Sequence, residues 1–113
     1  MLIEQKRILT RWQYKHRGNR RLTDAIRKLI KDLETLEPES FENLLRNRKD
    51  MDQVHSDGFF FFNVENDRVL LMIQIQEQYV TIIWIGTHPD YERIFKNNKA
   101  TIEKWLRSKN HIR

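Results

Sequence analysis

The sequence GFFFFNVENDRVLLMIQIQEQYVTIIWIGTHPDYER, residues Gly58 to Arg93, decides the fold of this chain. It holds three apolar runs that are separated by short polar turns: Phe59–Val64, Val69–Gln76 and Tyr79–Ile85. Turns this short leave no room for a helix, so they can join only consecutive antiparallel strands. The stretch therefore predicts a three-stranded antiparallel meander at the centre of the protein.

Two helical patterns precede the meander. A first helix is predicted from Lys6, with Ile8, Leu9 and Trp12 on one face, and Gly18 is expected to end it near His16 as a C-cap glycine. A second follows the i, i+3, i+4, i+7 spacing of an amphipathic helix without a break: Leu22, Ala25, Ile26, Leu29, Ile30 and Leu33. We expect the two helices to form an antiparallel hairpin across one face of the sheet.

The strand pattern also predicts the two faces of the sheet. Alternate residues of a strand point to opposite sides. One set is apolar throughout and should lie under the helices: Val69, Leu71, Ile73 and Ile75. The other set turns polar along its length and predicts a face partly open to water: Leu70, Met72, Gln74 and Gln76.

The remaining segments are assigned from their composition. Met1–Glu4 suits an edge strand, and Pro38 suits the first turn of a short third helix. Arg46–Asp57 is polar and is predicted to be irregular. Beyond the meander, two further helices are predicted: one capped by Thr87 or His88 that runs to about Lys96, and a last one through Ile102, Trp105 and Leu106. The prediction is a single α+β domain over residues 1–113, with an N-terminal helical hairpin packed on a small, mainly antiparallel sheet and a C-terminal helical segment.

Composition excludes several kinds of site. The 113 residues include no cysteine, so disulfides, thiolate chemistry and cysteine-based zinc sites are ruled out. The four histidines are widely spaced, and neither HExxH nor a glycine-rich phosphate loop occurs, so no metal or cofactor is expected. No apolar run reaches the length of a membrane span. We expect a cytoplasmic protein with no membrane partner.

Charge is distributed unevenly along the chain. Residues 1–33 carry ten Lys/Arg and three Asp/Glu, residues 34–67 carry three and nine, and residues 68–113 carry eight and four. Two basic ends thus flank an acidic middle. Such asymmetry favours a polyanionic partner, most often nucleic acid, although a solvated surface on an ordinary basic protein would give the same composition.

The chemistry on offer is RNA cleavage without a metal. That reaction needs a base for the 2′-hydroxyl, a cation beside the phosphate and an acid for the departing 5′-oxygen. His88 and His55 suit the acid and the base in either assignment, Arg68 suits the phosphate, and Tyr91 suits stacking on a base or orienting a phosphate. Each residue also has a structural alternative: His88 as a helix cap, His55 as a loop residue, Arg68 as a solvated charge and Tyr91 as part of the core.

Two parts of the chain resemble the HigB-type toxins of the RelE/ParE superfamily. The matching residues form the family's C-terminal signature: Phe62-Asn63-Val64, Asn66, Arg68-Val69, Ile82, Gly86-Thr87-His88 and Asp90-Tyr91-Glu92. The start of the chain also resembles the family's opening, at Ile3, Lys6, Leu9, Trp12, Lys15 and His16. Residues 33–56 do not align. The sequence departs from the pattern at Phe59–Phe62, where relatives often supply lysines, and at Asp67, where an aromatic residue usually precedes the arginine.

The resemblance implies an mRNA interferase from a toxin–antitoxin pair. Such a toxin cuts mRNA, usually on the ribosome, leaves a 2′,3′-cyclic phosphate and is neutralised by a small helix-turn-helix antitoxin; the toxin–antitoxin complex is expected to bind operator DNA. Arg68, His88 and Tyr91 match the family's active-site positions. The basic faces of residues 6–31 are expected to dock on ribosomal RNA, with Arg20, Arg27 and Lys31 among the contacts. Arg48 and Lys49 are also predicted to contact RNA and, with His55, would replace the missing lysines. The alternatives are a ParE-like gyrase poison and a plain RNA-binding module of the same fold.

Overall fold

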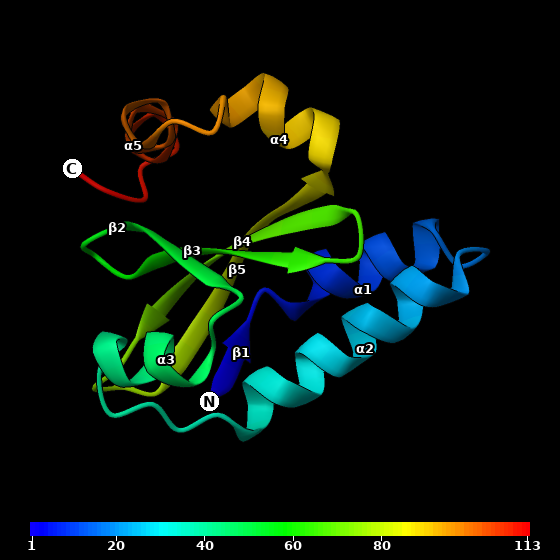
Figure 1. Ribbon diagram of the computed structural model, residues 1–113, viewed down its shortest axis with the longest axis horizontal. Coiled ribbons are helices and arrows are strands. Elements are labelled where there is room, and N and C mark those ends of the chain that lie inside the picture. Colours follow the sequence, from blue (N-terminus) through cyan, green and yellow to red (C-terminus); the bar gives the residue numbers. More distant parts are fainter.

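The computed structural model describes the whole chain, residues 1–113, as helices on both faces of one five-stranded sheet (Figure 1). The elements in chain order are β1 (Leu2–Glu4), α1 (Lys6–Lys15), α2 (Arg20–Thr35), α3 (Phe41–Asn47), β2 (Met51–His55), β3 (Phe59–Val64), β4 (Asp67–Gln74), β5 (Tyr79–Thr87), α4 (His88–Phe95) and α5 (Lys99–Ser108). The sheet order is β1-β5-β4-β3-β2, and all neighbours are antiparallel except β1 and β5, which are parallel. The α+β class, the meander and the N-terminal edge strand are confirmed.

The meander extends beyond its apolar runs at one end of the sheet. Strand β4 begins at Asp67, two residues before the apolar run, and β5 continues past Ile85 to Thr87. Both extensions lie at the same end, because the antiparallel ladder pairs Arg68 with Gly86. The ladder therefore carries polar residues out to the edge where β5 gives way to α4.

Helices α1 and α2 run side by side over one face of the sheet, as their apolar spacing predicts (Figure 1). Their stripes meet the apolar face of β4, with Leu9, Ile26 and Leu33 packed in one core with Val69 and Leu71. The contact confirms both the helical hairpin and the face predicted to lie under it. No helix of the structure has the length and apolarity that a membrane span needs.

Helices α4 and α5 cover the opposite face, which the strand pattern predicted to be partly open to water. A second core of buried residues lies there, and Met72 packs against it: Val54, Phe59, Phe61, Leu70, Tyr91, Phe95, Ile102 and Leu106. The face is nevertheless partly open to water, as predicted: Leu70 is buried, Met72 and Gln74 are half-buried, and Gln76, in the following turn, is exposed.

The four consecutive phenylalanines of β3 serve both cores. Phe59 and Phe61 lie in the α4/α5 core, and Phe60 and Phe62 lie in the α1/α2 core. A strand buried on both faces shows an uninterrupted apolar run instead of alternation. The run is therefore core, and it presents no aromatic surface to a nucleic acid.

The segment predicted to be irregular contains a strand. β2 pairs with β3 at the edge of the sheet, with a register shift between Gln53 and His55. Met51 lies in the α1/α2 core and Val54 in the α4/α5 core. The shift breaks the period of two, and three polar residues separate or flank the apolar ones, so the sequence pattern of a strand is lost.

Two helix boundaries differ from those predicted. Helix α1 ends at Lys15 as expected, but Gly18 is not in the left-handed conformation that a C-cap glycine adopts. Pro38 lies before α3, which begins after Ser40, whose hydroxyl accepts a hydrogen bond from the backbone N–H of Asn43. A side-chain cap therefore sets the start of α3 instead of the proline.

Candidate active site

The end of the sheet where β4 begins and β5 ends forms a small polar pocket. The backbone N–H of His88 donates to the carbonyl oxygen of Asn66 at 3.2 Å, which ties the start of α4 to the β3–β4 turn. The pocket has a volume of about 480 Å³ and contains no hydrophobic residue in its lining: Asn63, Glu65, Asn66, Asp67, Arg68 and His88. Arg68 and His88, twenty positions apart in the sequence, thus share one pocket.

Arg68 is the one arginine or lysine in the lining of this pocket, which also contains Glu65 and Asp67. Its guanidinium carbon lies 4.3 Å from the centre of the Tyr91 ring and 5.1 Å from that of Phe61. No carboxylate lies within ion-pair distance of Arg68, and its buried Nε has no hydrogen-bond partner. A buried donor left without a partner costs roughly 1–3 kcal/mol. The two aromatic rings hold the cation in place. The terminal nitrogens of the guanidinium are not buried and make no hydrogen bond, so they are open to an anion in the pocket.

Tyr91 is a buried aromatic residue that packs against Arg68. Only 1% of the residue is exposed, and its hydroxyl donates to Oδ1 of Asn97 at 2.9 Å. Burial raises the pKa of Tyr91 above the usual 10.0; the charge of Arg68 partly opposes this effect, and Asp52 and Glu92 add to it. The phenol is therefore neutral at physiological pH. In this geometry its ring packs against Arg68 and has no free face for an RNA base.

His88 is the imidazole of the pocket and is exposed. Its position follows from the helix start, because Thr87 is the N-cap of α4 and its Oγ1 accepts from the backbone N–H of Asp90 at 3.2 Å. The His88 ring lies 5.9 Å from the Tyr91 ring and nearly parallel to it, at 25°. Its Nε2 lies 3.2 Å from Oε1 of Glu92, one turn along the helix, so protonated His88 forms an ion pair there. The cap residue is thus Thr87, which leaves the imidazole of His88 free to face the pocket.

Asp67 connects the pocket to α1. Its carboxylate is the one charged group in the buried set, at 8% exposure, and Oδ2 accepts a 2.9 Å hydrogen bond from Nε1 of Trp12. Asp67 immediately precedes Arg68 in β4. The hydrogen bond therefore fixes α1 against the strand that presents the arginine.

The structure does not bring His55 to this site. His55 pairs with Phe59, which in turn pairs with Met72, four residues along β4 from Arg68. At about 3.3 Å per residue, that places His55 roughly 13 Å along the sheet, near its other end. Its Nδ1 accepts a hydrogen bond from the backbone N–H of Asp57 at 3.1 Å. The unrecognised strand β2 is the reason, since it runs away from the pocket.

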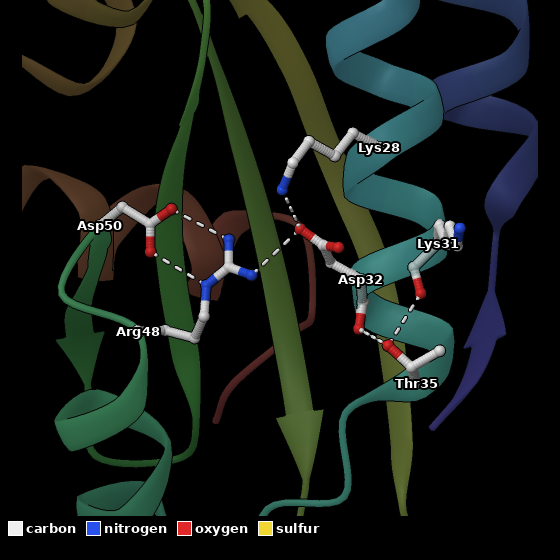
Figure 2. Close-up of polar contacts among 6 residues, drawn as sticks. All are labelled: Lys28, Lys31, Asp32, Thr35, Arg48 and Asp50. Carbon is white, nitrogen blue, oxygen red and sulfur yellow. Dashed lines mark hydrogen bonds and ion pairs between the residues drawn. The ribbon is translucent and has the colours of Figure 1, made fainter.

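Arg48 is held by carboxylates of its own chain (Figure 2). Its guanidinium donates two hydrogen bonds to Asp50, at 3.1 and 2.9 Å, and one of 3.2 Å to Asp32, which also accepts from Lys28 at 2.9 Å. The hydrogen bonds to Asp50 raise the pKa of Arg48, and the hydrogen bond from Lys28 lowers the pKa of Asp32. Arg48 therefore joins α2 to the turn that precedes β2 and offers little of its guanidinium to a phosphate.

The other predicted RNA contacts lie on the surface. On α2, Arg20 and Arg27 both lie near Asp24, at 3.9 and 2.8 Å. Lys31 and Lys49 are exposed and make no ion pair. None of these cations lines the Arg68–His88 pocket.

Six further residues line or support the site but were not predicted to do so: Trp12, Asn63, Glu65, Asn66, Asp67 and Glu92. Asn63 could have been placed from the strand register, since it pairs with Arg68 across the β3–β4 ladder. Glu92 stands four positions after His88, a helical spacing that brings two side chains together. Nothing in the sequence indicates the hydrogen bond from Trp12 to Asp67.

Other features of the molecule are less suited to phosphate chemistry. A larger hollow of about 900 Å³ near the N-terminus is lined by four glutamates, Glu34, Glu37, Glu39 and Glu77, which would repel a phosphate. No group of three or more His, Asp or Glu side chains is arranged to hold a metal ion. The Arg68–His88 pocket brings together an arginine without a carboxylate partner and an imidazole. The hollow of about 1030 Å³ that is lined by His55 and Lys99 offers an imidazole and a lysine but no arginine.

Comparison with known proteins agrees with the geometry. Residues 22–94 match the model of the HigB toxin family, described as a RelE-like toxic component of a toxin–antitoxin system. The matched stretch contains Arg68, His88 and Tyr91 and begins after α1. A search of the curated proteins gave no match.

Proposed function

Because the chain belongs to the HigB family of RelE-like toxins of toxin–antitoxin systems, we propose that it is an endoribonuclease that cleaves mRNA on the ribosome. The observation that carries the proposal is the guanidinium of Arg68, held on Tyr91 without a carboxylate partner and next to His88. A cation without a partner in a polar pocket is suited to a phosphate, whose charge increases in the transition state.

The reaction that fits these groups is attack by the ribose on its own phosphate. A base removes the proton of the 2′-hydroxyl, the 2′-oxygen bonds to phosphorus, and the bond to the 5′-oxygen breaks as an acid protonates it. The products are a 2′,3′-cyclic phosphate and a 5′-hydroxyl. Arg68 would bind the non-bridging oxygens of the phosphate, and the positive charge it supplies serves the role that a metal ion has in other nucleases.

His88 is the group placed to move a proton. Its imidazole is exposed beside the pocket, and its Nε2 lies 3.2 Å from the carboxylate of Glu92. A carboxylate in that position orients the ring, as the third member of a catalytic triad does. Tyr91, neutral and buried, serves as the support that orients Arg68.

The family also implies a partner. A toxin of a toxin–antitoxin pair is neutralised by its antitoxin, and we propose that this antitoxin is a small helix-turn-helix protein whose complex with the toxin binds operator DNA. We further propose that residues 1–113 act as one toxin domain in the cytoplasm, where the ribosomes are.

The experiment that tests this function is cleavage of ribosome-bound mRNA by the purified chain, with mapping of the new 5′ ends. The wild type should cut and leave 5′-hydroxyl ends, while Arg68→Ala and His88→Ala should each lose about 10²–10⁴ in rate. Melting temperatures serve as the control for folding. Well-folded variants that cut at the wild-type rate would refute the site. Growth arrest with intact mRNA and DNA-damage signalling would favour a gyrase poison instead.

A further inference from the structure

Helix α1 carries positive charge that the structure leaves uncompensated. Its sequence, KRILTRWQYK, contains no carboxylate. Four exposed cations of α1 and the turn after it have no acidic group within ion-pair distance: Arg7, Arg11, Lys15 and Arg17. The exception is Lys6, which lies 3.5 Å from Glu34. A helix face of this kind attracts a polyanion, because phosphate contacts release condensed counterions.

Helix α2 differs in this respect. Arg20 and Arg27 lie near Asp24, and Lys28 lies 2.9 Å from Asp32. The carboxylates of α2 reduce the positive potential around that helix, although α2 contains more basic residues than α1. Of the basic faces of residues 6–31, which the sequence predicts to dock on RNA, the face of α1 therefore has the least compensated charge.

Tyr14 projects from the same helix. The residue is 69% exposed, one of only two large hydrophobic residues so exposed, and its hydroxyl makes no hydrogen bond. The guanidinium carbon of Arg17 lies 4.5 Å from the ring centre, and Nη1 of Arg17 donates to the carbonyl oxygen of Tyr14 at 3.1 Å. An aromatic ring held in this way beside cations is the arrangement on which unstacked bases of single-stranded RNA lie.

A groove and a hydrogen bond link Tyr14 to the rest of the molecule. Tyr14, Arg17 and Arg27 line a hollow of about 510 Å³ between α1 and α2. On the other side of the helix, Trp12 bonds to Asp67, the residue before Arg68, and the ammonium of Lys15 lies 5.4 Å from the Trp12 ring. The second half of α1 therefore lies next to the start of β4, the strand that carries Arg68 (Figure 1).

We infer that the exposed face of α1 is an RNA-docking surface, on which Tyr14 stacks with an unpaired base while Arg11, Lys15 and Arg17 contact phosphates. This inference rests on the proposed function, and it adds a second contact surface to the cleavage pocket. The aromatic ring favours RNA over an acidic protein, because a nucleobase offers a flat surface to Tyr14 and a carboxylate-rich segment does not.

The test measures RNA binding apart from cleavage, in an Arg68→Ala background that does not cut. The probes are a single-stranded RNA oligonucleotide that carries 2-aminopurine, whose fluorescence is quenched by stacking, and purified 70S ribosomes. Tyr14→Ala should weaken binding of both by about 5–100-fold and abolish the quenching, whereas Tyr14→Phe should retain both. Leu2→Ala, at the other large exposed apolar residue, is the matched control and should change neither.

A second pair of variants tests the phosphate contacts. Arg11→Glu with Lys15→Glu should weaken binding and make it less dependent on salt. The slope of the logarithm of the binding constant against the logarithm of the salt concentration should become shallower by about 0.7 for each phosphate of a single strand that the variant no longer binds. Lys104→Glu, on the exposed face of α5 and equally free of an ion pair, reverses a charge in the same way and should leave the slope unchanged. Circular dichroism should show that all variants stay folded, since each altered side chain is exposed.

Three outcomes would decide between the possible roles of this surface. If Tyr14→Ala binds both RNA probes as tightly as Tyr14→Phe, the docking surface is refuted. If Tyr14→Ala keeps RNA binding but no longer binds the antitoxin, the surface serves a protein partner and the inference is likewise refuted. If the wild-type chain cuts no RNA and Tyr14→Ala still abolishes the stacking signal, the proposed function fails while the docking surface stands.

Discussion

Nε1 of Trp12 donates a 2.9 Å hydrogen bond to Oδ2 of Asp67 and so joins the first helix to the strand that presents Arg68. A carboxylate as buried as this one needs its donor. Trp12→Phe removes that donor, and we expect the free energy of unfolding to fall by about 1–3 kcal/mol. Urea unfolding measures the loss.

A double-mutant cycle separates this hydrogen bond from the packing of the indole. Asp67→Ala removes the acceptor, so each single change breaks the hydrogen bond, as such a cycle requires. If the bond is formed as the structure shows, the two changes together should differ from the sum of the single changes by about 0.5–3 kcal/mol. Strict additivity would show that the residues do not interact in solution.

Tyr91 should support Arg68 through its ring and not through its hydroxyl. Tyr91→Phe keeps the ring and removes the hydrogen bond to Asn97, so it should keep most of the cleavage rate and lose about 0.5–1.5 kcal/mol of stability. Tyr91→Ala removes the ring under the guanidinium and should cleave RNA far more slowly. Equal inactivity of Tyr91→Phe and Arg68→Ala would assign the phenol a direct chemical role.

The hydroxyl of Tyr91 also predicts an alkaline limit of stability. Burial raises the pKa of the folded-state phenol above 10.0, so the folded state favours the neutral form. The contribution to stability is complete below pH 10 and is lost as the pH rises beyond it. Tyrosinate absorbance, followed against pH in the wild type and in Tyr91→Phe, measures this effect. The wild type should show a late part of the titration that coincides with unfolding, and Tyr91→Phe should lack that part.

His55→Ala should leave the cleavage rate close to that of the wild type. His55 lies about 13 Å along the sheet from Arg68, too far to share a proton with a phosphate held there. His88→Ala is the matched control, since it removes the same imidazole from the pocket. A loss of activity in His55→Ala equal to that in His88→Ala would mean that the substrate spans both ends of the sheet.

The sequence was enough to predict how Arg68 and His88 meet. Short turns require antiparallel pairing, and antiparallel pairing brings the start of one strand beside the end of the next. Because those two facts are local, chain order alone brings Arg68 and His88 to the same edge of the sheet. The exact register of Arg68 with Gly86 also depends on a shift between Leu70 and Leu71, which the sequence did not predict. The strand order beyond the meander could not be derived from chain order, since β1 pairs with β5 across most of the chain.

The contacts that the sequence did not predict depend on which face of an element is covered. Arg48 resembles any other loop cation until α2 and β2 are placed together, which brings Asp32 and Asp50 to it. Tyr91 could equally have been exposed until α4 is packed on the sheet. In both cases the side chain acquires its role from a neighbour distant in sequence, and local patterns carry no information about such neighbours.

The Asp32–Arg48 contact predicts a specific loss of stability in acid. The hydrogen bond from Lys28, with that from Arg48, lowers the pKa of the Asp32 carboxyl below 3.8, while burial acts in the opposite direction. A lowered pKa in the folded state means that the stabilisation is present above pH 3.8 and disappears as the pH falls below it. Asp32→Asn should therefore be less stable than the wild type at neutral pH and should lose less stability on acidification. Since both side chains are partly exposed, at 25% and 20%, the difference at neutral pH should be modest, about 0.5–1 kcal/mol.

Asp24→Asn is the matched control on the same helix: its carboxylate is 55% exposed and pairs with Arg27 at the surface, so its removal should change stability little at any pH. Urea unfolding at a series of pH values compares the three proteins, and identical pH profiles for Asp32→Asn and the wild type would show that Arg48 does not hold α2 in solution.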